Sequence, residues 1–394
     1  MSSFFRTLRV PHLQKTAHYR ILERHLRPVV GQVHDEIQKE VMDIVIETAK
    51  NSQNTIDLSG DAQYDSPGHT AMHGRYALLD VKTNFVALEP KSLDLCLSRL
   101  QNTLRDLAPT VVIRSITTDR DPSVGKLLTT KYPTITQFYD GWHFARNLKK
   151  LIWKKQDQVQ MIPMKGWVTP LTNHLYHSFA SSNGDGQLTV EKFLSFFLHI
   201  QNKHKNFSEI NGFKFQRVHQ CEHGDAIKNR SDWIDLDNPA HKKAFTIIWE
   251  MATSPKRLKD LHKVSPFFST SQVESYNSLS ILYHSKNCFF AENLPMRVQM
   301  TVAHWNTIKL ELRRGDRKVV GRKSHFNKSK KQIVWKNLMS KGTYEFRRTI
   351  LERARHHRID NTTLSQIARF VEDDSPQTSG NEDNETDEMG TDSD

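Results

Sequence analysis

Cysteine is scarce in this chain of 394 residues, and long apolar runs are absent. Only Cys96, Cys221 and Cys288 occur, and so small and odd a set argues against a disulfide framework and for a reducing compartment. No stretch approaches the roughly 20 apolar residues that a membrane-spanning helix requires. The first residues, Met1–Pro11, are too polar for a secretory signal. We therefore expect an intracellular protein without a membrane segment.

Acidic residues are outnumbered by basic ones except at the C-terminal end. The formal net charge is +12, yet residues 372–394 hold ten acidic residues and no Lys or Arg. Without those ten negative charges, residues 1–371 carry +22. Such a balance favours nucleic acid as partner, and with it the nucleus as location. The alternative is a solvated basic surface without a partner. The acidic segment, rich in Ser, Thr and Asn, is typical of disorder.

Apolar spacing divides the rest of the chain. Val33, Ile37 and Val41 recur at helical spacing and predict a helical N-terminal arm over 1–54. Residues 55–155 alternate between strand and helix patterns. The expected strands are 56–61, 75–80, 84–89, 113–118 and 134–139, with helices over 93–107, after Asp121 and from about Trp142.

This order of elements, three strands followed by helix, strand, helix, strand and helix, is that of an RNase H-like fold. We therefore predict an α/β protein whose RNase H-like core spans 55–155 and is completed by 266–312. The interval 156–265 is too long for one connection and is expected to be a mostly helical insertion. A basic helical region over 313–371 and a disordered acidic tail over 372–394 would follow.

Three acidic residues stand where a two-metal nuclease needs them. Asp61 and Asp119 each end an apolar run, and Glu274 lies in a polar helix start. Carboxylate oxygens suit Mg²⁺ or Mn²⁺, and two such cations can clamp a phosphodiester. A single Asp after a strand more often caps a turn, so the combination carries the prediction. Asp65, beside Ser-Pro-Gly, competes with Asp61 for the first position or forms a turn. Less favoured are Asp57, Asp80 and Asp121.

Four segments in the same order resemble a group of transposon-derived DDE transposases of animals. Gly60-Asp61-Ala-Gln-Tyr-Asp65-Ser-Pro-Gly-His69 resembles the segment that begins their catalytic domain. Thr118-Asp119-Arg120 and Ser269–Ser278 resemble their second and third acid segments. Asp140-Gly-Trp-His143 fits the signature of the related hAT, Mutator-like and Kolobok superfamilies, in which two residues separate an Asp or Cys from a His. The resemblance extends from about residue 12 to 350.

The resemblance implies metal-dependent DNA cleavage and strand transfer. Asp61, Asp119 and Glu274 would hold Mg²⁺ or Mn²⁺, and His143 would position a phosphate or a flanking strand. A homo-oligomer is implied as well, because pairing two DNA ends requires two active sites. Departures from the group's pattern are Ala62, Asp121 and Asn277, and no N-terminal zinc-finger or THAP module is recognisable. Two alternatives remain: a domesticated, catalytically inactive nuclear protein that binds DNA or protein, and a nuclease without joining activity.

Basic residues after His143 predict a DNA-contacting helix. Arg146, Lys149 and Lys150 fall near one helical face, although an ordinary amphipathic helix would look the same. Arg313 and Arg314 begin a second basic run, which is either a DNA-contacting loop or a nuclear-import signal.

Cys221-Glu-His223 is a weak metal-binding pattern, because a structural zinc site needs four ligands. Asp140 and His143 would complete the set if the insertion folded back onto the core. Simple packing of Cys221 and His223 is the favoured interpretation.

Overall fold

The computed structural model describes residues 15–64, 74–88, 92–155, 158–224, 231–265, 269–285, 292–327 and 332–356. The chain divides into two units, Met1–Val33 with Glu345–Asp394, and His34–Tyr344. The first unit contains the helix α2 (Lys15–Ile21), the π-helical turn η1 (Leu22–Leu26) and the helix α13 (Glu345–His356). Helix α3 (Arg27–Lys50) runs from the first unit into the second.

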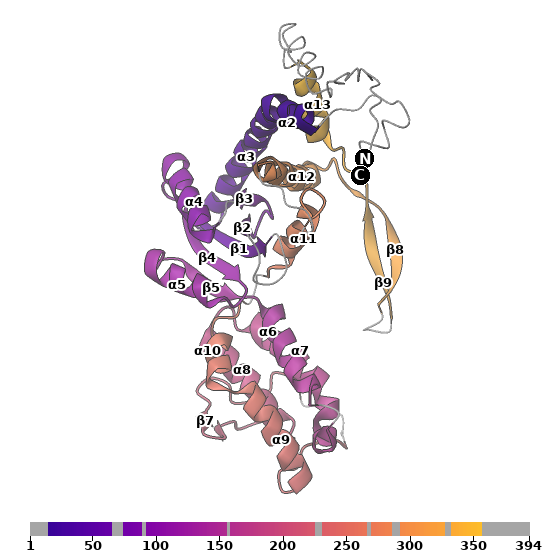
Figure 1. Cartoon of the computed structure of the whole chain (residues 1–394). Helices are drawn as coiled ribbons and strands as arrows, with labels where there is room; N and C mark the ends of the chain where they lie inside the picture. Colours follow the sequence, from indigo (N-terminus) through magenta and orange to yellow (C-terminus); the bar gives the residue numbers. More distant parts are fainter. Residues whose placement is uncertain are drawn as a thin grey trace, which may run out of the picture. The chain divides into compact units, whose positions relative to one another are not determined.

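The second unit contains a five-stranded mixed sheet (Figure 1). Its strands are β1 (Thr55–Tyr64), β2 (Gly74–Asp80), β3 (Val86–Leu88), β4 (Val112–Thr118) and β5 (Thr136–Tyr139). Their order across the sheet is β3-β2-β1-β4-β5. The pairs β1–β2 and β2–β3 are antiparallel, whereas β1–β4 and β4–β5 are parallel. The predicted α/β class is therefore confirmed.

Helices cover both faces of this sheet, and strand β2 shows how. Tyr76 and Leu78 belong to one apolar cluster, while Ala77 and Leu79 belong to another. This alternation is the period of two expected of a strand buried on both faces. The first cluster includes residues of α3, α4 (Leu93–Leu107) and α5 (Pro122–Lys131). The second includes residues of α11 (Ser271–Ser280) and α12 (Leu294–Arg314).

Side chains, instead of another strand, form hydrogen bonds with the backbone of the edge strand β3. Asn306 of α12 is fully buried; its amide oxygen accepts from the Val86 N–H at 2.9 Å, and its amide nitrogen donates to the Val86 carbonyl at 3.1 Å. Gln38 of α3 donates to the Ala87 carbonyl at 3.0 Å. Because these groups satisfy the exposed backbone, the edge offers little to a pairing strand.

Most of the chain between β5 and α11 is helical. The helices are α6 (Gly141–Trp153), η2 (Val159–Trp167), α7 (Val168–Ser181), α8 (Gly186–His199), α9 (Pro239–Ala252) and α10 (Pro255–Leu261). The strands β6 (Glu209–Ile210) and β7 (Phe213–Lys214) form a two-stranded sheet. These elements share an apolar core around Phe193 and Phe197 of α8. Ala145, Leu148 and Ile152 of α6 also lie in this core, so by its packing α6 joins the insertion instead of the 55–155 segment.

The chain leaves the sheet and returns to it at the same place. The Tyr139 N–H at the end of β5 donates to the Lys263 carbonyl at 2.7 Å, and the Ser265 N–H donates to the Tyr139 carbonyl at 2.9 Å. Val264 thereby forms a parallel bridge with Tyr139. The two ends of the insertion are therefore adjacent.

The prediction of a helical region over 313–371 is wrong for residues 319–327 and 332–339. These residues form an antiparallel hairpin of β8 (Val319–Asn327) and β9 (Gln332–Met339). Exposed apolar side chains such as Val320 and Trp335 are mixed along it with basic residues without regular alternation, because both faces of the hairpin are exposed. The acidic segment 372–394, predicted to be disordered, lies outside the described residues.

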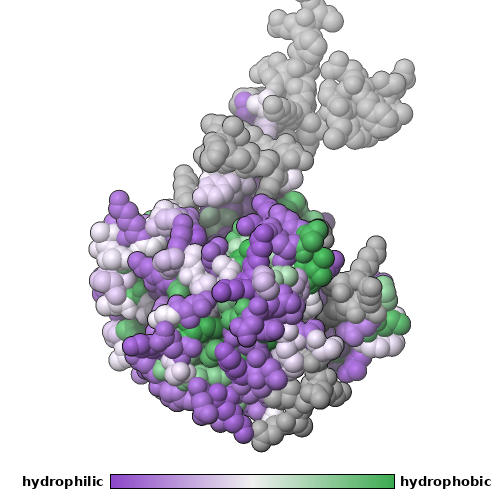
Figure 2. Space-filling view, turned by 90° about the horizontal axis from the view of Figure 1, so that it is seen from below, coloured by the Kyte–Doolittle hydropathy of each residue, from purple (hydrophilic) through white to green (hydrophobic). Residues whose placement is uncertain are grey.

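The surface of the described residues is mostly polar. Figure 2 shows a largely hydrophilic face with apolar side chains in small patches. Among the described helices, none has the length and apolar character needed to cross a bilayer.

Candidate active site

Parallel pairing of β1 and β4 brings the first two predicted acids side by side. Ser59 of β1 is in register with Thr117 of β4, so two residues further along each chain come Asp61 and Asp119. Neighbouring strands lie about 4.8 Å apart. Asp61 is also in register with Ala77 of β2, whose side chain packs in the cluster that contains α11. Both acids therefore lie near the C-terminal ends of β1 and β4, on the face of the sheet that α11 covers.

Helix α11 brings the third acid to the same edge. Val273 and Tyr276 are fully buried against the sheet, while the Glu274 side chain between them is 46% exposed. One turn further, the Asn277 amide donates to Asp61 Oδ2 at 2.9 Å. The Ser59 hydroxyl donates to the Ser269 carbonyl at 3.0 Å, just before the helix. These contacts fix the first turn of α11 over the end of β1.

His143, in the first turn of α6, bridges the second and third acids. Its Nδ1 lies 3.1 Å from Asp119 Oδ1, and its Nε2 lies 3.5 Å from Glu274 Oε1. A hydrogen bond with Asp140, together with the negative charges of Asp119, Asp140 and Glu274, outweighs burial and raises the pKa of His143. The imidazole is therefore biased toward its cationic form within this cluster.

Asp140 connects the two helices that present His143 and Glu274. Its Oδ1 accepts from the backbone N–H groups of Trp142 at 2.7 Å and His143 at 3.0 Å, which caps α6. Its Oδ2 accepts from the N–H and hydroxyl of Thr270, at 2.6 and 2.9 Å, directly before α11. Burial opposes ionisation, but the hydrogen bonds from His143 and Thr270 prevail and hold the pKa of Asp140 well below its usual range.

The neighbouring carboxylates of this cluster interact unfavourably with one another. Burial, followed by the charge of Asp119, raises the pKa of Asp61 to about 6 despite hydrogen bonds from Ala62 and Asn277. Burial likewise raises the pKa of Asp119. Asp119 Oδ1 is buried and accepts no hydrogen bond from the described residues. Neighbouring carboxylate oxygens are the type of ligand that Mg²⁺ and Mn²⁺ prefer, so these residues could hold such an ion.

The less favoured aspartates have structural partners. Asp57 is fully buried, ion-paired with Arg114, and accepts from the Ser115 hydroxyl at 2.6 Å. Asp80 closes the turn after β2 by accepting from the Thr83 N–H at 2.7 Å. Asp121 caps α5 by accepting from the Ser123 N–H at 2.8 Å. Asp65, the alternative first acid, lies outside the described residues.

Basic residues of α6 extend from the acidic cluster. Arg146 and Lys150 are exposed and follow His143 by three and seven residues, which places all three on one helical face. Arg146 lies over the Trp142 ring at 4.7 Å, and Lys149 over the Trp153 ring at 4.5 Å.

The other predicted basic pair is at the end of α12. Arg313 and Arg314 occupy its last turn, and Arg314 is ion-paired with Glu40 of α3. Arg313 is exposed and therefore remains the better candidate of the two for contact with a phosphate.

The less favoured alternative for Cys221 and His223 does not fit the contacts of Asp140 and His143. Asp140 and His143 do not complete a metal site with Cys221 and His223, because Asp140 is engaged by Thr270 and His143 by Asp119. Cys221 and His223 instead lie with two other histidines inside the insertion.

Sequence reasoning missed Thr270 and the contact of Asn277 with Asp61. Both contacts join residues more than a hundred positions apart, and no local sequence pattern predicts them. The only available signal was the run Asp140-Gly-Trp, which is typical of a helix N-cap.

A scan against models of known protein families gives no match for this chain. Among curated proteins, none matches it either.

Proposed function

We propose that this chain is a DDE-type polynucleotidyl transferase, similar to transposon-derived transposases, which cuts and joins DNA strands in the nucleus. The observation that carries the proposal is the cluster of Asp61, Asp119 and Glu274. Two of these acids sit on adjacent parallel strands, and the third is linked to them through His143 and Asn277.

An RNase H-like core is part of this proposal. Its support is the strand order β3-β2-β1-β4-β5, with an antiparallel meander on one side of β1 and two parallel strands on the other. In this arrangement the central strand and its parallel neighbour end at the same edge. Asp61, three residues before the end of β1, and Asp119, directly after β4, lie near this end, which is a natural place for a divalent cation.

The three acids would hold one or two Mg²⁺ or Mn²⁺ ions against a DNA phosphate. When bound, such ions activate the attacking oxygen and stabilise the leaving one. His143 would donate from its cationic ring to a non-bridging phosphate oxygen beside Asp119 and Glu274. Asp140 favours the charge on His143 and orients its helix, so it acts as a positioning residue.

DNA would approach along α6 and the β8–β9 hairpin. Arg146 and Lys150 continue the face of α6 that carries His143. On the hairpin, Lys323 and Lys336 are directly opposite each other. Like charges in such a pair destabilise a hairpin, and a phosphate between them would relieve the repulsion.

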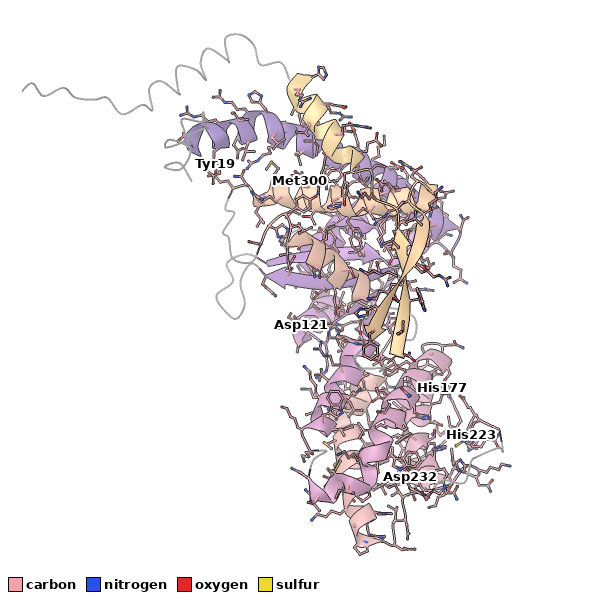
Figure 3. The ribbon with its side chains drawn as sticks, turned by 90° about the vertical axis from the view of Figure 1, so that its right-hand side faces the viewer. Tyr19, Asp121, His177, His223, Asp232 and Met300 are labelled. Atoms are coloured by element: carbon pink, nitrogen blue, oxygen red, sulfur yellow. The ribbon has the colours of Figure 1, made fainter. Side chains whose placement is uncertain are left out.

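The test is a cleavage and strand-transfer assay with Mg²⁺ or Mn²⁺, on DNA that carries the repeats flanking the chain's own locus. Glu274→Gln should lower the rate at least about 100-fold, because even outer partners of metal ligands contribute 10–100-fold. The control is Asp121→Asn, a nearby carboxylate (labelled in Figure 3) whose capping role an asparagine preserves. This control should keep the wild-type rate.

The alternatives predict different results. Cleavage without joined product would identify a nuclease. Salt-sensitive DNA binding without cleavage in either metal would identify a domesticated binding protein. Equal cleavage by wild type and Glu274→Gln would contradict the proposed site. Titration of Mn²⁺ by electron paramagnetic resonance adds a readout that does not depend on activity.

A further inference from the structure

Four metal-ligating side chains converge inside the helical insertion, away from the acidic cluster. His199 ends α8, His204 follows in the next loop, and Cys221 and His223 lie in the loop after β7. One ligand atom from each lies within 4.8 Å of all the others. Figure 3 labels His223, on the same part of the insertion as His177 and Asp232.

Three of the separations between ligand atoms are those of a tetrahedral site. Cys221 Sγ lies 3.5 Å from both His199 Nδ1 and His204 Nδ1, and His199 Nδ1 lies 3.3 Å from His223 Nε2. Zinc bonds of about 2.0–2.1 Å to nitrogen and 2.3 Å to sulfur place tetrahedral ligands roughly 3.3–3.6 Å apart. The three imidazole rings are also mutually edge-on, with centroids 4.8 to 5.2 Å apart.

The outer contacts of two histidines select the nitrogens that face the centre. His204 Nε2 lies 3.1 Å from the Asn202 side-chain oxygen, and His223 Nδ1 lies 3.0 Å from the Gly224 carbonyl. Both oxygens only accept, so these ring nitrogens carry the protons. The lone pairs therefore reside on His204 Nδ1 and His223 Nε2, which are the inward atoms. Outer partners of this kind accompany metal-bound histidines.

The surroundings favour a closed structural site. The Cys221 N–H donates to the His204 carbonyl at 2.9 Å, which joins the two loops. Trp167 and Trp233 pack against the His199 ring with centroids 6.2 and 5.7 Å away. Three imidazoles and one thiolate fill a tetrahedral shell and leave no position for a reacting water. The loops contain little regular structure, so a metal would contribute strongly to their order.

We propose that His199, His204, Cys221 and His223 bind one structural zinc ion that holds the loops of the insertion together. Thiolate and imidazole ligands select zinc over Mg²⁺ or Mn²⁺, which prefer the oxygens of the acidic cluster. The chain would thus carry two metal sites of different chemistry, and the zinc site does not depend on the proposed DNA chemistry.

The test measures metal content and the cobalt spectrum of the full chain. Wild-type protein should retain one zinc per chain after gel filtration, by elemental mass spectrometry. Cobalt in its place should give a sulfur-to-cobalt charge-transfer band and the strong visible bands of a tetrahedral site. Cys221→Ser should abolish the charge-transfer band. Asp61→Asn and Glu274→Gln should leave both the zinc content and the spectrum unchanged, which separates this proposal from the previous one.

Milder variants keep the test independent of folding defects. Asn202→Gly removes the acceptor of His204 Nε2 and tolerates the left-handed backbone at this position (φ 59°), so it should lower zinc affinity about 10–100-fold in competition with a chelating dye. His177→Ala is the matched control, because His177 is bonded to Glu222 at 2.6 Å and is outside the set of four. Wild-type protein without zinc, or a cobalt band that persists in Cys221→Ser, would overturn the proposal.

Discussion

Asp61 is a proposed metal ligand whose charged carboxylate lowers the stability of the folded chain when no metal is bound. Its carboxylate is packed beside Asp119, and its pKa is raised to about 6 by burial first and by that neighbouring charge second. An unfolded aspartate has a pKa of about 3.9. The folded chain therefore binds more protons between these values, so its stability falls as the pH rises from about 4 to about 6.

Asp61→Asn should consequently stabilise the chain in chelator at pH 7.5. The expected gain is about 1–2 kcal/mol, less than the full shift implies, because the amide loses one hydrogen bond from Ala62 or Asn277. Thermal unfolding in EDTA measures this gain. Adding Mg²⁺ should raise the unfolding temperature of wild type only. If wild type and Asp61→Asn had equal unfolding temperatures in EDTA from pH 4 to pH 8, the result would contradict repulsion between Asp61 and Asp119.

Binding of Mn²⁺ should weaken as the pH falls through about 6. Protonation of Asp61 removes one ligand charge, and the raised pKa of Asp119 acts in the same direction. Paramagnetic resonance of free Mn²⁺ between pH 5 and 8 measures the affinity. An affinity that stays constant across this range would exclude Asp61 as a ligand.

At the residue scale, the sequence was sufficient to identify candidate site residues that lie in or next to a strand or helix. Asp61 was predicted to end a strand but lies inside β1, three residues before its end, whereas Asp119 directly follows β4 as predicted. Their proximity follows once β1 and β4 pair. The partners of Cys221 and His223 were not predictable. His199 and His204 belong to a different segment, and only the folded insertion brings all four together.

Among the elements, α6 and α11 are coupled through a single side chain. Asp140 caps the first helix with one oxygen and binds the residue before the second with the other. Its pKa is lowered, so this stabilisation is present above pH 4 and is lost as the pH falls toward the folded value.

Asp140→Ala should lower the free energy of unfolding by about 2–4 kcal/mol, because it removes a cap and leaves buried donors of Thr270 unpaired. Denaturant unfolding at pH 7 gives the value. Asp121→Ala serves as comparison, since it removes a cap that touches one helix only. If the two variants had equal stability, the link between α6 and α11 would contribute nothing.

The hairpin offers a test of DNA contact. Lys336→Glu places a carboxylate opposite Lys323 and should stabilise the hairpin by about 0.2–1 kcal/mol. The same change should weaken DNA binding and reduce the slope of affinity against salt concentration by about 1–2. Fluorescence anisotropy at several salt concentrations measures both affinity and slope. An unchanged slope would remove the hairpin from the proposed interface.

Periodicity predicted helices and core strands better than it predicted this hairpin. The stripe Leu93, Leu97, Leu100 and Leu104 led to a helix over 93–107, and the structure has a helix with the same bounds. Residues 319–339 mix basic and apolar side chains, and both faces of their hairpin are exposed. Without a buried face no period of two emerges, so the basic composition suggested a helix instead.

Over the whole molecule, charge is unevenly distributed along the chain. Residues 372–394 carry ten acidic residues within a chain of net charge +12. Truncation after residue 371 should therefore raise affinity for non-specific DNA at low salt, since an acidic segment competes with phosphate for the basic surface. The difference should vanish at high salt, where such interactions are screened. Comparing the two chains by anisotropy decides this; identical affinities at low salt would exclude competition.

The domain order was predicted more closely than the domain limits. A split α/β core with a helical insertion was expected from the long interval between Asp119 and Glu274. The end of the core segment was predicted at residue 155 because the helix that starts near Trp142 was assigned to the core. The apolar face of α6 instead packs with α7 and α8, and such packing preferences are set by tertiary contacts.

The adjacency of Tyr139 and Val264 also makes the chain a suitable scaffold for recombination. Because the insertion begins and ends at neighbouring points, a short linker that joins Tyr139 to Val264 could replace the whole insertion. The insertion is thus an exchangeable cassette: another helical module with equally close ends can replace it without altering the order of strands in the sheet. The exchange would also remove Asp140 and His143, so a replacement module has to supply both of them, while the strands that hold Asp61 and Asp119 stay unchanged.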